Sequence, residues 1–358
     1  MTTIRRVQAH PVRVPLHTPF VTAIRTVHAV ESVLVEVTDS DGCAGWGEGA
    51  ATWKITGDSV AGMQAAVVGP LRKALIDRDP GDLASLVARV QGAVVGNTAA
   101  KSAVDCALHD LAARRLGIPL PRLLGSTRLR IATDVTLAAG SAPEMAAAAT
   151  QRVRDGFGVL KVKVGDGTAD DLERLRAIRA AVGPGVPVRI DANQGWSARQ
   201  AVRIVRGMED AGLDLELVEQ PVAAGDLAGL AFVTERVATA VLADESVWSA
   251  ADLLEIVRRR AADLVNIKLA KCGGLGPALA MLAVARAAGI GVLLGSMMET
   301  HVGVGATASL ATVSGSAGID DLDAAWWLTA SPVRGGLRYE GAEVVLPDAP
   351  GLGIEGLA

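Results

Sequence analysis

Four charged residues in the middle of the sequence each end a short aliphatic run and precede a polar turn and a helical pattern. They are Asp191, Glu219, Asp244 and Lys268, and they recur at intervals of 24 to 28 residues. Such an interval is the length of one strand, one helix and two short loops. Because the strands of a (β/α)8 barrel end at one rim, where the active site is built, these side chains are expected to meet there.

The three acids of this set predict a metal site. Neighbouring strands lie about 4.8 Å apart, so Asp191, Glu219 and Asp244 are expected to converge at successive strand ends. Uncompensated carboxylates at such separations raise one another's pKa steeply. A hard divalent cation with oxygen ligands removes the repulsion, and Mg²⁺ leaves coordination positions open for water and substrate. The alternative for any single acid is that it caps the helix that follows it.

Two lysines share one face of a predicted strand, and a third lysine ends a strand on the other side of the barrel. Lys161 and Lys163 alternate with aliphatic residues, so their amines point to the same side. Inward lysines are costly unless anions or a function compensate them. Mutual repulsion and a nearby metal are expected to lower their pKa values, which suits a base near neutral pH. With Lys268 opposite, the set could address both faces of one carbon. The alternative is that Lys161 or Lys268 snorkels or pairs with an acid.

Strand and helix patterns alternate over residues 129–324, where these side chains lie. Amphipathic alanine-rich segments, such as 170–182 and 198–211, separate the candidate strands. Eight strands joined by helices predict one closed barrel without an exposed sheet edge. The candidate strands are residues 131–137, 158–164, 186–191, 215–219, 240–244, 263–268, 291–295 and 317–321.

Residues 1–128 show strands followed by a run of helices, the pattern of a separate α+β domain. The strands are expected at 4–14, 32–37 and 44–48, the last two joined by a hairpin turn at 39–42. A long polar loop between the first two strands would hold Thr18, Thr22 and Arg25. A second loop at 52–58 leads into helical patterns up to residue 117.

The glycine-rich tail, residues 325–358, is expected to return to this N-terminal domain. The predicted fold is therefore α/β: a (β/α)8-type barrel with an α+β capping domain formed by the N-terminal region and the C-terminal tail.

Composition excludes several other classes of protein. The 358 residues carry a net charge of −4, and the pI is near 5.8, so nothing favours binding to nucleic acid or to an anionic membrane. Three cysteines without metal-ligand or paired spacing indicate a reducing compartment. With no apolar signal core and no run long enough to span a membrane, we expect a cytoplasmic protein.

Lys161-Val162-Lys163, Asp191, Glu219, Asp244 and Lys268 together resemble the enolase superfamily, in its muconate-lactonizing-enzyme subgroup. Enolase-superfamily sites combine a lysine or histidine base with Mg²⁺. The resemblance covers essentially the whole chain. It implies one Mg²⁺ per subunit on the three acids, Lys163 and Lys268 as the acid/base pair, and Lys161 as an electrostatic helper. It also implies a homo-oligomer.

Within that subgroup, Asp321 and Asp323 favour a particular substrate class. On a strand end the two acids would point to the same side, where they suit a cation such as a substrate ammonium. The alternative is an acidic turn in solvent. This Asp-x-Asp feature resembles the dipeptide epimerases, as do the stretches 18–26 and 55–58.

The resemblance to dipeptide epimerases implies a dipeptide substrate, L-Ala-D/L-Glu, epimerised at its C-terminal α-carbon. Arg25 would reach over the barrel to the glutamate side chain, since a guanidinium suits bidentate carboxylate binding. Thr136, Ser296 and Met298 would line the substrate site.

Other reactions use nearly the same residues, so the fold alone does not choose between them. One alternative is an o-succinylbenzoate synthase with N-acylamino acid racemase activity, whose substrates lack the ammonium that Asp321 and Asp323 would hold. Another is a muconate cycloisomerase, whose substrate brings two carboxylates and no cation. From different classes, Lys268 could form a Schiff base in an aldolase-like barrel, or the barrel could bind a ligand without catalysis.

Overall fold

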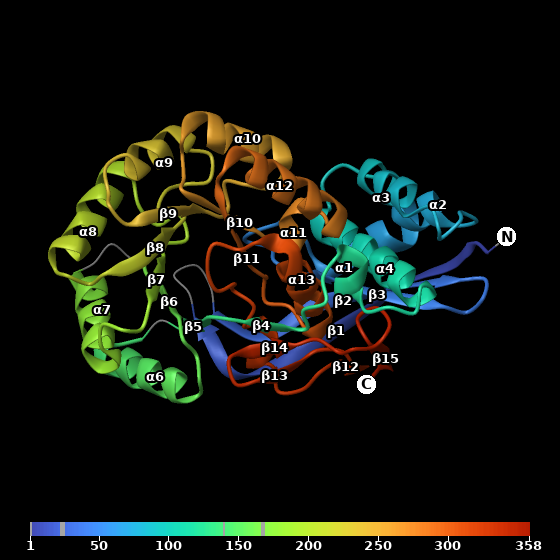
Figure 1. Ribbon diagram of the computed structural model, residues 1–358, viewed down its shortest axis with the longest axis horizontal. Helices are drawn as coiled ribbons and strands as arrows, with labels where there is room; N and C mark the ends of the chain where they lie inside the picture. Colours follow the sequence, from blue (N-terminus) through green and yellow to red (C-terminus); the bar gives the residue numbers. More distant parts are fainter. Residues whose placement is uncertain (1, 22–25, 139, 166–168) are drawn as a thin grey trace.

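A computed structural model of the chain describes residues 2–21, 26–138, 140–165 and 169–358. Figure 1 shows a curled parallel sheet whose outer face is covered by helices, beside a smaller part built from the N-terminal strands and helices. The red C-terminal segments lie against the blue N-terminal strands. The predicted α/β fold, a barrel with an α+β capping domain, is confirmed.

The N-terminal part begins with an antiparallel sheet of three strands in the order β1-β2-β3. Its strands are longer than predicted. Most of the segment that was expected to be a polar loop belongs to β1 and β2, and Thr18 lies within β1. Thr22 and Arg25 fall outside the described residues. The predicted turn at 39–42 is confirmed, and the Asp39 carboxylate accepts the backbone N–H groups of Asp41 and Cys43. The strands are β1 (Ile4–Val21), β2 (Thr26–Asp39) and β3 (Ala44–Ala50).

Helices follow the sheet as the sequence predicts, and the longest of them lies directly on β3. Gly45 and Gly47 make this close approach possible. An added Cβ at Gly47 would stand 2.0 Å from the carbonyl oxygen of Ala103, and one at Gly45 would stand 2.2 Å from that of Ala107. The helices are α1 (Val60–Ala66), η1 (Val67–Leu71), α2 (Arg72–Leu75), α3 (Leu83–Gly92), α4 (Thr98–Arg115) and α5 (Leu120–Leu124).

The second part is a parallel sheet in the order β11-β10-β9-β8-β7-β6-β5 with helices between its strands. The strands are β5 (Val135–Leu137), β6 (Leu160–Lys163), β7 (Val188–Asp191), β8 (Leu215–Glu219), β9 (Ala240–Ala243), β10 (Leu264–Ile267) and β11 (Gly291–Leu294). The helices are α6 (Ala142–Arg154), α7 (Ala169–Val182), α8 (Ala198–Asp210), α9 (Leu227–Thr234), α10 (Ala250–Arg259), α11 (Leu269–Cys272), α12 (Leu275–Ala288) and α13 (His301–Ser314).

Two of the eight predicted strands differ from expectation. The first, 131–137, is divided into β4 (Arg130–Ala132) and β5, and β4 pairs with the C-terminal tail instead of the barrel. The eighth, 317–321, is all described but forms two isolated bridges in place of a regular strand. Asp320 pairs with Thr133 and Asp321 pairs with Gly295, so this short segment joins both edges of the sheet and closes the barrel.

The C-terminal tail returns to the N-terminal part, as predicted. Asp110 on α4 accepts backbone N–H groups from Trp46 on β3 and from Leu352 in the tail, at 2.7 and 2.5 Å. Leu328 forms a bridge with Leu16 of β1. The tail consists of η2 (Ala324–Trp327), β12 (Val333–Gly335), β13 (Arg338–Glu340), β14 (Glu343–Val345) and β15 (Ile354–Leu357).

The three cysteines carry free thiols, and Cys106 and Cys272 are buried. Over the described ranges, no helix combines the length and the apolar character that a membrane span requires.

Substituting Gly47 by alanine should test the contact between β3 and α4. The new methyl group would overlap backbone atoms that cannot rotate away, so we expect the free energy of unfolding to fall by about 1–3 kcal/mol or more. Urea denaturation measures this change. Gly92→Ala is the matched control, because no atom lies within 4 Å of its added Cβ and alanine is favoured in helices by up to about 1 kcal/mol. Equal stability of the two variants would contradict this account of the packing.

Candidate active site

The parallel ladder brings the predicted charged residues to one rim of the barrel. Lys163 on β6 pairs in register with Asp191 on β7, and Asp191 pairs with Glu219 on β8. Asp244 follows β9 directly, and Lys268 follows β10 as the N-cap residue of α11. Because side chains alternate along a strand, this register turns all of them toward the inside of the barrel mouth.

Lys161 lies at the centre of the acidic group. Its Nζ is 2.6 Å from Glu219 Oε2, 2.8 Å from Asp321 Oδ2 and 3.3 Å from Asp191 Oδ2. The side chain is only 2% exposed. One buried ammonium group therefore links acids from β7, β8 and the segment that closes the barrel.

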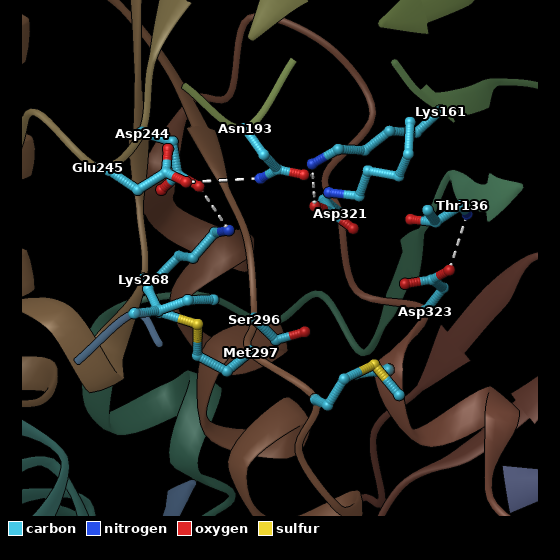
Figure 2. Close-up of a pocket in the computed structure, with 14 residues that line it drawn as sticks. Thr136, Lys161, Asn193, Asp244, Glu245, Lys268, Ser296, Met297, Asp321 and Asp323 are labelled. Atoms are coloured by element: carbon cyan, nitrogen blue, oxygen red, sulfur yellow. Dashed lines mark hydrogen bonds and ion pairs between the residues drawn. The ribbon is translucent and has the colours of Figure 1, made fainter. Parts of the chain in front are cut away.

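The other two lysines each hold one acid. Lys163 Nζ lies 2.6 Å from Asp191 Oδ2, and Lys268 Nζ lies 2.8 Å from Asp244 Oδ2. Figure 2 shows Lys268 and Lys161 entering the pocket from opposite sides, Lys268 from the end of β10 and Lys161 from β6. The predicted opposition of lysines across the barrel mouth is therefore present in the geometry.

In this structure, carboxylates oppose the expected lowering of the pKa values of Lys161 and Lys268. Burial alone would lower the pKa of Lys161, but the carboxylates of Asp321, Glu219 and Asp191 outweigh it and raise that pKa well above its usual value. Burial also opposes the charge of Lys268, yet the carboxylate of Asp244 raises its pKa. The sequence pattern predicts repulsion between the lysines, but the acids that other elements bring near outweigh it for Lys161 and Lys268.

The acids of the rim form a candidate site for a divalent metal ion. Among the described side chains, no three His, Cys, Asp or Glu groups stand together as a ready metal site, since lysine ammonium groups lie between the acids. The donor chemistry nevertheless fits a hard cation, because the three carboxylates supply the oxygen ligands that Mg²⁺ prefers. Buried oxygen atoms without a hydrogen-bond partner, Oε2 of Glu245 and Oδ1 of Asn266, lie beside this acid set.

The strand ends surround an open pocket. Predicted site residues that line it are Thr136, Lys161, Lys163, Asp244, Lys268, Ser296, Met298, Asp321 and Asp323. Asp191 and Glu219 are fully buried beside it, and Arg25 lies outside the described residues. Every predicted site residue within the described part of the chain thus lies around one rim, with Lys161 at the centre.

The two acids of the closing segment have different surroundings. Asp321 is paired with Lys161, whereas Asp323 Oδ2 accepts hydrogen bonds from the Thr136 backbone N–H at 2.8 Å and from Trp327 Nε1 at 2.9 Å. Burial and the nearby charge of Asp321 raise the pKa of Asp323 to about 6. The alternative of an acidic turn in solvent is therefore wrong, because both side chains face the pocket (Figure 2).

Several residues of the rim were not predicted. Asn193 and Glu245 line the pocket and approach each other at 3.4 Å, and Asn266 Nδ2 donates to Glu219 Oε1 at 3.0 Å. Gln220 Oε1 accepts the Asp244 backbone N–H at 2.9 Å, which fixes the position of that strand end. Asn266 precedes Lys268 by two residues, so the period of a strand could have revealed that it faces inward.

A buried pair of acids supports the loop that lines the pocket after β11. Glu48 on β3 accepts the Thr300 N–H and the Gly303 N–H at the start of α13, each at 2.8 Å. Glu299 accepts the Met297 N–H at 3.1 Å. Burial and the nearby Glu48 carboxyl raise the pKa of Glu299 to about 8. The capping sheet is thus bonded directly to the segment that carries Ser296 and Met298.

A (β/α) barrel with acids and opposed lysines at its strand ends defines the class of protein to which this chain belongs. Residues 4–125 match the family described as "Mandelate racemase / muconate lactonizing enzyme, N-terminal domain". Residues 144–356 match "Enolase C-terminal domain-like". The chain belongs to the mandelate racemase/muconate lactonizing enzyme family of the enolase superfamily, and the predicted resemblance is confirmed.

Relatives within this family cover nearly the whole chain. The L-Ala-D/L-Glu epimerase of Bacillus subtilis is 43% identical over 356 residues, which are 99% of this chain and 97% of that protein. The L-Ala-D/L-Glu epimerase of Clostridium acetobutylicum is 41% identical over 344 residues, 96% of each chain.

Solved structures agree with the sequence relatives. The substrate-liganded complex of the Bacillus subtilis L-Ala-D/L-Glu epimerase has a TM-score of 0.97 at 42% identity and covers 99% of both chains. The dipeptide epimerase from Enterococcus faecalis, complexed with Mg and the dipeptide L-Leu-L-Tyr, has a TM-score of 0.94 at 37% identity. That match covers 98% of this chain and 99% of the other.

The buried acid Glu299 predicts a pH dependence of stability. Its folded pKa of about 8 exceeds the ordinary value of 4.5, so the folded state keeps a proton that the unfolded state loses first. The stability due to this group is present at acid pH and is lost as the pH rises toward 8. Glu299→Gln should therefore reduce the decline in unfolding free energy between pH 5 and 8, by an amount on the order of a few kcal/mol.

Denaturant titrations at several pH values measure this effect. Glu255→Gln is the control, because Glu255 lies on the surface and hydrogen bonds from Arg258 and Arg259 lower its pKa to about 2. It titrates below the tested range and should leave the profile unchanged. A Glu299→Gln profile parallel to that of the wild type would show that Glu299 is ionised in the folded protein.

Proposed function

We propose that this protein is a Mg²⁺-dependent dipeptide epimerase that inverts the α-carbon of the C-terminal residue, with L-Ala-D/L-Glu as its preferred substrate. The observation that carries the proposal is the geometry of the rim. Lysines enter the pocket from opposite sides, and two further acids, Asp321 and Asp323, line the same pocket. Relatives named as dipeptide epimerases over nearly the full chain support it.

Asp191, Glu219 and Asp244 would hold the metal ion, one per subunit. When bound, Mg²⁺ supplies a Lewis acid for the substrate's α-carboxylate and competes with the lysine ammonium groups for the carboxylates, which lowers the lysine pKa values. Structures of dipeptide epimerases complexed with Mg support this assignment.

Lys163 and Lys268 would be the acid and the base. One lysine removes the α-proton, and the electron pair of the broken C–H bond moves into the carboxylate to give an enolate. The lysine on the other face then donates its proton to the α-carbon, so the configuration is inverted. Lys161 would stay charged beside the developing negative charge, and the acids that raise its pKa suit that role.

Recognition of the rest of the dipeptide would come from other segments. Asp321 and Asp323 would bind the N-terminal ammonium, with Asp323 oriented by Thr136 and Trp327. Arg25 would bind the glutamate side chain. Ser296 and Met298 would line the site with Thr136.

We also propose a division into a capping domain, residues 1–128 completed by 325–358, and a barrel domain, residues 129–324. The antiparallel sheet and α1–α5 lie in the first part, and the parallel sheet lies in the second. Family resemblance supports a homo-oligomer, and the free cysteines suit the reducing cytoplasm.

The two-base scheme predicts a distinct failure for each lysine variant. Lys163→Ala and Lys268→Ala should each reduce epimerisation of Ala-Glu by about 10²- to 10⁴-fold, the usual contribution of a general acid or base. Each variant should still exchange the α-proton of one epimer with D₂O, because the remaining lysine reaches only one face. Mass spectrometry and chiral chromatography measure exchange and inversion separately.

Lys73→Ala is the control, since Lys73 is exposed on α2, and it should keep wild-type activity. In the wild type, EDTA should stop exchange and added Mg²⁺ should restore it. The epimerase assignment fails if the wild type exchanges no α-proton of any dipeptide in the presence of Mg²⁺. A borohydride-trapped adduct on Lys268 would favour the Schiff-base alternative instead.

Specificity gives a further prediction. Arg25→Met should lower kcat/KM for Ala-Glu by about 10²-fold or more, because the glutamate side chain loses a charge-assisted partner, and should affect Ala-Leu far less. Asp323→Asn should weaken both dipeptides alike, since both carry the ammonium. The measurement is kcat/KM for Ala-Glu, Ala-Leu and N-succinyl-Glu. If N-succinyl-Glu is the best wild-type substrate, the racemase and synthase alternative replaces the epimerase.

A further inference from the structure

Lys271 is a buried lysine close to the active site, and no catalytic step described above uses it. It lies on the short helix α11, three residues after Lys268, and its side chain is 1% exposed. The residue does not line the pocket. Its role must therefore be exerted through the residues that it touches.

The contacts of Lys271 use the whole donor capacity of its ammonium group. Nζ donates to the Asp244 carboxylate Oδ1 and to the Asp244 carbonyl oxygen, each at 2.5 Å, and to the Asn266 carbonyl oxygen at 3.0 Å. A lysine has three N–H donors, so none remains for a substrate. A buried ammonium group is costly unless such partners satisfy it.

These bonds divide the two oxygen atoms of Asp244 between two lysines. Oδ1 is held from outside the pocket by Lys271, while Oδ2 meets Lys268 on the pocket side at 2.8 Å. The Asp244 backbone N–H donates to Gln220 Oε1 at 2.9 Å. The backbone and one oxygen of this acid are therefore fixed, and its second oxygen is presented to the pocket.

The same ammonium group connects two neighbouring strand ends. Asp244 follows β9 and Asn266 lies in β10, which also leads to Lys268. The Lys271 backbone N–H donates to the Lys268 carbonyl oxygen at 3.0 Å. Lys271 thus sets the position of the acid Asp244 relative to the turn that carries the acid/base lysine.

We infer that Lys271 is a positioning residue that orients Asp244 as a metal ligand and fixes its distance from Lys268. This inference rests on the metal site of the proposed function. Groups that hold metal ligands in place commonly contribute 10- to 100-fold to metal affinity.

The sign of the change in Mg²⁺ affinity tests this inference. Coulomb's law alone predicts that removing a positive charge near a cation site tightens cation binding. If Lys271 positions Asp244 as a metal ligand, removing it weakens Mg²⁺ binding instead. Lys271→Met should therefore bind Mg²⁺ about 10- to 100-fold more weakly than the wild type, measured by isothermal titration calorimetry without substrate. Lys268→Met, which removes the pocket-side lysine, should lose turnover without weakening Mg²⁺ binding.

Lys101→Met is the matched control for burial. Lys101 is a buried lysine on α4 that does not line the pocket, so its loss should leave Mg²⁺ affinity unchanged. Thermal unfolding of each variant shows whether it is folded. If Lys271→Met does not fold, Lys271→Gln carries the test, since its amide can donate to two of the three acceptors without a charge. It should show a smaller loss of affinity in the same direction.

The outcomes separate this inference from the proposed function. Weaker Mg²⁺ binding by folded Lys271→Met or Lys271→Gln supports the positioning role. If the wild type binds Mg²⁺ and these variants bind it equally or more tightly, the positioning role alone is overturned. If the wild type binds no Mg²⁺, the metal site of the proposed function and the role of Lys271 are both wrong.

Discussion

A balance between buried carboxylates and buried ammonium groups holds the rim of this barrel together. The single ammonium group of Lys161 contacts Asp191 on β7, Glu219 on β8 and Asp321 on the segment that closes the barrel. Removing one partner of such a buried pair leaves an unpaired charge and costs about 3–5 kcal/mol. The charged rim is therefore stable only as a set, and the surrounding fold must fix every member in place.

Contacts below the rim also help to fix the charged residues in place. Arg189 is buried under the acids, where its Nη1 donates to the Ile319 carbonyl oxygen at 2.5 Å and to Asp134 Oδ2 at 3.0 Å. Ile319 directly precedes the two residues that close the barrel. A full eighth strand would position that segment by a regular ladder. Here two bridges and a buried guanidinium do so, and the backbone is free to turn Asp321 and Asp323 into the pocket.

Much of the fold and of the rim could be predicted from the sequence because both depend on short-range regularities. The residue types at successive strand ends placed Asp191 and Asp244 at one rim, since strand period and repeat length determine where a side chain points. The lysine pKa values could not be predicted this way, because they depend on acids that other elements bring near. Contacts such as Glu48 with Thr300, which are 252 residues apart in sequence, have no local signal. The closing segment was misjudged for a similar reason, since its two bridges depend on both edges of the sheet.

The residues proposed for the chemical step and those proposed to select the substrate lie on different kinds of segment. The acids and lysines proposed to hold the metal ion and to move protons lie at the ends of regular strands or directly after them, where the hydrogen-bonded ladder allows little displacement. Residues proposed to recognise the substrate, such as Asp323 and Ser296, lie on the closing segment and on the loop after β11. Glu48 bonds the capping sheet to that loop, so the cap and the loop are held in a common position. Changes in these irregular segments can therefore alter which dipeptide is bound while the ladder keeps the acids and lysines in register. This arrangement explains physically how one barrel rim can serve different substrates.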